Sequence, residues 1–175
     1  MTSRIKAGPS IVPPAPTQSA PRQKAGRTRG IITGLTDAFV IDGNTRARIA
    51  RKDSSDHAVI KPYLEGKTLR SWFTKESDLW LILFPKGVTQ AVLGAAPAVK
   101  AESWLEATYP GVYGWLHQFK DAATNRQDVG DYWWELRACD YYDVFEHPKL
   151  VWPDISKLPR FSMDSRGHFP GTLGI

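Results

Sequence analysis

The sequence has little cysteine and no long apolar segment. Cys139 is the only cysteine among 175 residues, which excludes a disulfide framework and a zinc site built on several cysteines. The longest apolar run, residues 79–85, is far shorter than the roughly 20 residues of a membrane-spanning helix. Residues 1–30 lack the apolar core of a secretory signal. These absences favour a cytoplasmic protein that has no membrane partner.

Recognisable catalytic motifs are also missing. A methyltransferase that acts on a base amino group needs a glycine-containing loop for S-adenosylmethionine and a polar–Pro–Pro–aromatic loop. Residues 12–15 (VPPA) have the two prolines but neither flanking residue. Residues 153–154 and 164–166 match a metal-dependent nuclease motif only in part, because Arg166 stands where a lysine is needed. The four histidines have no metal-ligand spacing. We expect no catalytic residue, no metal site and no cofactor in this chain.

The net charge of +5 is unevenly distributed along the sequence. Residues 1–30 contain six basic and no acidic residues, whereas the rest contains 17 basic and 18 acidic residues. Within that remainder, residues 31–75 have eight basic against five acidic residues, and residues 100–146 have four against nine. Such polarisation is typical of a domain that turns one face toward nucleic acid, although a solvated surface of mixed charge gives similar counts.

Composition divides the chain into a leader and one domain. Residues 1–29 are basic and rich in proline but poor in large apolar residues, so we expect a disordered leader there. Residues 30–175 are enough for one domain. The apolar patterns predict strands at residues 38–42, 79–84 and 149–152, and helices at 98–107 and 110–125. Residues 45–51 fit either a helical turn or a strand, residues 60–72 an irregular β segment, and the aromatic stretch from residue 131 predicts β structure. The predicted fold class is α+β, a mixed domain with a twisted sheet and a few helices.

Several segments are similar to one known family. Residues 60–72 (IKPYLEGKTLRSW) and 30–42 (GIITGLTDAFVID) resemble two segments of the TaqI-like C-terminal specificity domain. Residues 109–116, 126–137, 145–155 and 161–169 follow in the order of that family. This domain is the target recognition domain of type IIG restriction–modification enzymes and related adenine-N6 DNA methyltransferases.

The resemblance implies that this chain recognises double-stranded DNA for a methylase domain or subunit. The methylase would bind S-adenosylmethionine, and the parent enzyme often carries an endonuclease as well. The family's methylase motifs precede this region and its chains continue past residue 169, so we expect residues 30–175 to be a C-terminally incomplete domain without activity of its own. A separate specificity subunit acting in trans and a protein–protein interaction module remain open as alternatives.

The basic and aromatic residues of these segments are the candidate DNA contacts. Lysine and arginine supply most contacts to phosphates and base edges, and tryptophan can stack on bases. For Lys61 a structural role beside Pro62 is an equal alternative, for the two tryptophans packing is the alternative, and Arg137 could instead pair with Glu135 or Asp140. The predicted DNA-binding residues are Lys61, Lys67, Arg70, Trp133, Trp134, Arg137 and Lys149.

Overall fold

A four-stranded sheet lies at the centre of the molecule. The structure is a computed structural model that describes residues 28–156 and 160–175. The strands β1 (Val40–Asp42), β3 (Leu79–Ile82), β2 (Ile60–Leu64) and β6 (Phe169–Pro170) lie side by side in that order. β3 is antiparallel to both neighbours, and β2 is parallel to β6. The strand predicted at residues 79–84 is therefore confirmed over its first four residues.

The strand predicted at residues 38–42 is only partly correct. Ala38 and Phe39 belong to the short helix α1 (Thr36–Phe39), and only the last three residues are β1. The backbone N–H groups of both residues donate to the Leu35 carbonyl, and this helical turn buries both side chains completely. Two buried apolar residues in succession suit a turn that packs on the core better than a strand with alternating faces.

A second, three-stranded sheet joins distant parts of the sequence. β4 (Lys149–Pro153) lies between β5 (Ser162–Asp164) and β7 (Leu173–Gly174) and is antiparallel to both. The strand predicted at 149–152 is thus confirmed. Thr28 and Arg29, which we expected in the leader, pair with the C-terminal end through the Arg29–Gly174 bridge and two Thr28–Ile175 backbone bonds. The described part of the predicted leader is therefore ordered, and residues 1–27 lie outside the described residues.

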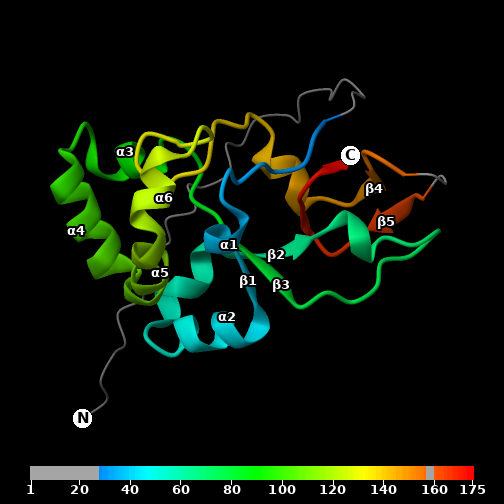
Figure 1. Ribbon diagram of the computed structural model, residues 1–175, viewed down its shortest axis with the longest axis horizontal. Helices are drawn as coiled ribbons and strands as arrows, with labels where there is room; N and C mark the ends of the chain where they lie inside the picture. Colours follow the sequence, from blue (N-terminus) through cyan, green and yellow to red (C-terminus); the bar gives the residue numbers. More distant parts are fainter. Residues whose placement is uncertain (1–27, 157–159) are drawn as a thin grey trace, which may run out of the picture.

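Most helices gather at one end of the long axis, and the second sheet lies at the other (Figure 1). α3 (Val88–Leu93), α4 (Ala98–Thr108), α5 (Pro110–Leu116) and α6 (Lys120–Asn125) form the helical end. The helix predicted at 110–125 is interrupted by the 3-10 turn η3 (His117–Phe119). Residues 45–51, which fitted either a helical turn or a strand, lie in or directly after helix α2 (Gly43–Ala50). The Asp42 carboxylate caps the first turn of α2 by accepting from the Thr45 N–H at 2.7 Å. The remaining 3-10 turns are η1 (Ser54–Val59), η2 (Gly66–Thr68) and η4 (Tyr142–Glu146).

The prediction of β structure from residue 131 is wrong for residues 131–148, which precede β4. The described backbone there forms turns and η4, with one isolated bridge between Val129 and Leu136. The aromatic residues that suggested strands point into the main core instead, and Trp134 and Phe145 are fully buried. The buried carboxylate of Glu135 ties this irregular backbone to the start of α3, because it accepts from the N–H groups of Asp131, Gly87 and Thr89.

The two sheets and the helices form one α+β domain, as predicted. The main core lies under the central sheet and the helical end, and a smaller cluster of Leu64, Leu69, Val151 and Leu173 lies beneath the second sheet. Within the described ranges, none of the helices has the length and apolarity needed to cross a bilayer.

Candidate nucleic-acid interface

Helix α2 and its C-terminal end carry a strip of cations. We call Arg46, Arg48, Arg51 and Lys52 the basic strip. The Arg46 guanidinium lies 3.7 Å from the centre of the Trp80 ring, and that of Arg48 lies 5.7 Å from the Trp115 ring. None of the four forms an ion pair with another residue that the structure describes. Their charge is therefore available to an external anion.

A tight turn between β2 and β3 carries two exposed aromatic residues. Leu69 and Thr74 form a bridge at its base, and we call residues 69–74 the Trp72 turn. Trp72 is 85% exposed and Phe73 57% exposed. Trp72 also has a φ of 76°, in the left-handed region that costs a residue with a side chain about 1–2 kcal/mol. A large apolar residue that is both exposed and strained serves no evident purpose in the fold, so the turn is a candidate contact surface.

A polar cleft lies beside the Trp72 turn. It has a volume of about 690 Å³, and both aromatic residues of the turn line it together with Lys75, Arg166 and His168. The His168 Nδ1 lies 2.8 Å from an oxygen of Asp164, which fixes the orientation of the imidazole. Glu76 and Asp78 also line the cleft, so its charge is mixed.

The three predicted contacts in residues 61–70 differ in their availability. Lys67 is the most exposed, at 77%, and its ammonium lies 2.6 Å from a Glu65 oxygen. Arg70 donates from one nitrogen to the carbonyl oxygens of Lys67 and Leu69, both at 2.8 Å, which holds its guanidinium beside the Trp72 turn. Lys61 lies apart from them, paired at 3.0 Å with Glu146. Lys67 and Arg70 thus share one surface, and Lys61 belongs to another.

The predicted aromatic contacts lie inside the domain. Trp134 is fully buried and donates its indole N–H to the Thr89 hydroxyl at 3.1 Å. Trp133 packs edge-on against Trp134 and is 9% exposed. Packing, the alternative for both tryptophans, is the role that the structure shows.

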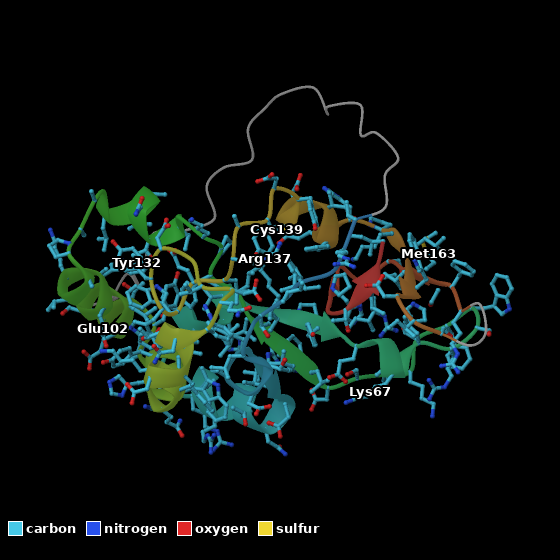
Figure 2. The ribbon with its side chains drawn as sticks, turned by 45° about the horizontal axis from the view of Figure 1, so that its top comes forward. Lys67, Glu102, Tyr132, Arg137, Cys139 and Met163 are labelled. Atoms are coloured by element: carbon cyan, nitrogen blue, oxygen red, sulfur yellow. The ribbon has the colours of Figure 1, made fainter. Side chains whose placement is uncertain are left out.

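Arg137 lies on the surface, where its side chain is 49% exposed. Its guanidinium pairs with Asp128 at 3.3 Å, not with Glu135 or Asp140. Figure 2 shows Lys67 and Met163 at the opposite end of the molecule from Glu102 and Tyr132, with Arg137 between them. Of the nine acidic residues in 100–146, only Glu102, Glu106 and Asp121 lie on the helices of the helical end, beside Lys100 and Lys120. The charge polarity of the sequence is therefore not matched by a strongly acidic helical end.

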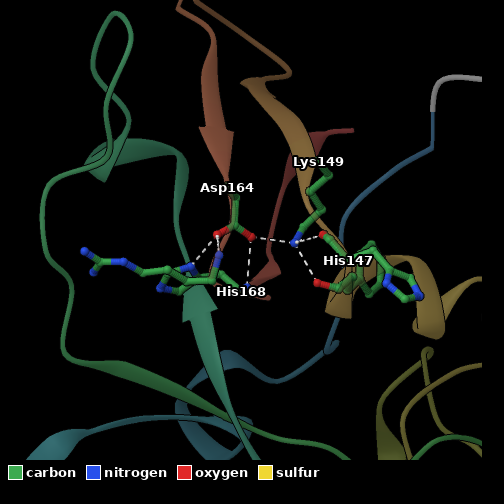
Figure 3. Close-up of polar contacts among 6 residues, drawn as sticks. His147, Lys149, Asp164 and His168 are labelled. Atoms are coloured by element: carbon green, nitrogen blue, oxygen red, sulfur yellow. Dashed lines mark hydrogen bonds and ion pairs between the residues drawn. The ribbon is translucent and has the colours of Figure 1, made fainter.

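Lys149 is buried rather than exposed. Figure 3 shows its ammonium between the Asp164 carboxylate, at 2.5 Å, and the carbonyl oxygens of Phe145 and His147. The side chain of Lys149 is 6% exposed and that of Asp164 is 2% exposed. Asp164 also accepts from the backbone N–H groups of Arg166 and His168. Lys149 therefore joins β4 to β5 and to the loop after it, and it has no surface to offer DNA in this conformation.

The stability of the domain is expected to depend on the ionisation of Asp164. Burial raises the pKa of this carboxyl, but hydrogen bonds from His168, Lys149 and the Arg166 N–H outweigh burial and hold the pKa well below its ordinary value. A lowered folded-state pKa means that the contribution is complete above about pH 5 and is lost as the pH falls.

Urea unfolding of the wild type and Asp164→Asn at a series of pH values checks this. The difference in free energy of unfolding should shrink steadily below about pH 5, because the carboxyl of the unfolded chain takes up a proton while the folded Asp164 is still ionised. A difference that stays constant down to pH 3 would contradict this assignment.

Across residues 28–156 and 160–175, histidine, cysteine and acidic side chains do not gather in groups of three or more that could hold a metal ion. The basic strip and the aromatic residues of the Trp72 turn are the surface features that the sequence analysis did not select as sites.

Comparison with known proteins gives no family. Neither a protein-family model nor a curated protein matches this chain.

Proposed function

We propose that this domain binds double-stranded DNA through the basic strip on α2 and the surface around Lys67 and Arg70. The observation that carries the proposal is the basic strip itself. Its four cations have no ion-pair partner among the described residues, whereas Lys86 and Lys120 at the helical end, and Arg137 between the two ends of the molecule, are each paired with an acid. Arginine and lysine side chains without an ion-pair partner are what phosphate contacts require.

The domain would serve as the target recognition domain of a site-specific adenine-N6 DNA methyltransferase or type IIG restriction–modification enzyme. This part of the proposal rests on the similarity of residues 30–42 and 60–72 to the TaqI-like specificity domain. A methylase domain or subunit would supply S-adenosylmethionine and the catalytic residues, in the cytoplasm. The structure is compatible with this because both segments contribute to the central sheet and leave α2 between them exposed.

Neutralising the basic strip should weaken DNA binding and reduce its salt dependence. The triple variant Arg48→Gln, Arg51→Gln, Lys52→Gln removes three cations but leaves Arg46, which packs on Trp80. Each lost phosphate contact should lower the magnitude of the slope of log K against log salt by about 0.9, so a fall of about 2–3 is expected. Fluorescence anisotropy of a labelled duplex over a series of salt concentrations measures this slope.

A matched triple variant separates a local effect from the loss of net charge. Lys86→Gln, Lys100→Gln, Lys120→Gln removes the same charge at the helical end and should leave the slope close to that of the wild type. Circular dichroism checks that both variants fold. Equal slopes for the two triple variants would exclude the basic strip as the DNA surface, and no binding by the wild type would exclude the proposed function.

A further inference from the structure

The Trp72 turn presents its aromatic residues on a rigid base. Leu69 is fully buried in the small core cluster and anchors one side of the turn. The Arg70 N–H donates to the Phe73 carbonyl at 2.8 Å and the Lys75 N–H to the Thr68 carbonyl at 2.9 Å, which close the turn. The Trp72 N–H itself donates to the Phe161 carbonyl at 2.9 Å and ties the tip to the segment before β5. The indole is therefore held out into solvent by a fixed backbone.

Two cations flank the aromatic residues of the turn. The Arg70 guanidinium is held at the turn by the Lys67 and Leu69 carbonyls, and Lys75 lines the polar cleft together with Trp72 and Phe73. Arg166, Glu76 and Asp78 line the same cleft, so charges of both signs lie near the aromatic side chains. Exposed aromatic side chains beside cations complement a duplex, whose stacked bases lie between two rows of phosphates, and the proposed function makes DNA the occupant.

We infer that Trp72 is a wedge that enters a base-pair step of the bound duplex, unstacks it and bends the DNA. The inference rests on the proposed function, because the cations must first bind the duplex. Insertion covers an indole that is otherwise in water, while Arg70 and Lys75 contact the phosphates on either side of the opened step. Flexible pyrimidine–purine steps such as TA open at the lowest cost, so the wedge would also favour sites that contain one.

The strained backbone at Trp72 allows a test that separates loss of the indole from loss of stability. Trp72→Gly removes the indole and relieves the left-handed φ, so this variant should be at least as stable as the wild type while losing the wedge. Trp72→Phe keeps an aromatic ring at the same place and is the conservative control. The probe is a short duplex with 2-aminopurine in a central TA step, whose fluorescence rises when the step unstacks, and a matched duplex carries the reporter in a stiff A-tract.

The wild type should raise the 2-aminopurine fluorescence of the TA duplex more than that of the A-tract duplex, and Trp72→Phe should retain part of the rise. Trp72→Gly should abolish it and bind the TA duplex about tenfold more weakly, the loss expected for one stacked base. Wild-type binding with no rise in fluorescence, or an equal rise with Trp72→Gly, would overturn the wedge but leave the proposed function intact. Absence of any salt-dependent binding to both duplexes would overturn the proposed function as well.

Discussion

Replacing Lys149 by methionine is expected to lower the free energy of unfolding by about 3–5 kcal/mol, because the change leaves the buried Asp164 carboxylate without its cation. The two side chains are 6% and 2% exposed, so water cannot replace the lost partner. The ammonium also donates to the Phe145 carbonyl at 2.6 Å, and this acceptor loses its bond too. Chemical denaturation followed by tryptophan fluorescence measures the change.

Lys61→Met is the matched control for this prediction. Lys61 is also paired with a carboxylate, at 3.0 Å, but the Lys61 and Glu146 side chains are 28% and 57% exposed. Its loss should cost no more than about 1 kcal/mol, because solvent screens the pair. If both variants lose the same stability, Lys149 is not the buried structural cation that the geometry shows.

The double variant Lys149→Met, Asp164→Leu distinguishes the pair from the network around it. A buried ion pair can often be replaced by apolar residues of similar size at little cost. Here the recovery should be incomplete, since Asp164 also accepts from the N–H groups of Arg166 and His168, which a leucine leaves unpaired.

The elements that the sequence predicts correctly are those whose pattern is local. Residues 79–82 form a continuous apolar run that Pro85 follows, and they are the central strand β3. Residues 110–116 begin with a proline and place Val112 and Leu116 four residues apart, and both are fully buried on one face of α5. The period and the length of an apolar pattern are sufficient to predict an element when its core contacts lie on one of its faces.

The β structure predicted from residue 131 is wrong because the contacts that decide it are nonlocal. Its aromatic residues have high strand propensity, but their partners are distant in sequence: Trp134 bonds to Thr89 and Tyr132 to the Ala96 carbonyl. Strand propensity mainly reflects side-chain packing, so distant neighbours can meet the same need with an irregular backbone. No periodicity within residues 131–145 contains this information.

The burial and the ion pairs of the candidate site residues could not be predicted from the sequence for a related reason. Both depend on which residues the fold brings together. Lys149 looks like an ordinary surface lysine until β5 brings Asp164 beside it. The basic strip appears in the sequence only as part of a charge count, because the sequence does not show that Arg48 and Arg51 form no ion pair with a residue of the described ranges. Trp72 lies within the basic stretch of residues 31–75, but its strain and exposure follow from the turn that the fold imposes.

Removal of the Glu135 carboxylate is expected to be nearly as damaging as loss of Lys149. Glu135 is fully buried and accepts from the backbone N–H groups of Gly87 at 3.1 Å, Thr89 at 3.0 Å and Asp131 at 2.9 Å. It therefore caps the start of α3 and closes the turn at residues 130–135. In Glu135→Ala these three donors lose their acceptor in a site closed to solvent, so the free energy of unfolding should fall by about 3–4 kcal/mol.

Thermal and urea unfolding of Glu135→Ala and Glu102→Ala test whether this carboxylate organises the irregular segment. Glu102 lies on α4 and pairs with the partly exposed Lys120 at 2.7 Å, so its loss should cost less than about 1 kcal/mol. Hydrogen exchange adds a local readout, since the Thr89 N–H should lose its protection in Glu135→Ala but not in the control. A global loss of stability with unchanged exchange at Thr89 would show that the carboxylate acts elsewhere. A loss of both stability and protection at Thr89 would show that the Glu135 carboxylate holds the irregular segment against α3. Hydrogen bonds to this carboxylate would then do what strand pairing does in a sheet.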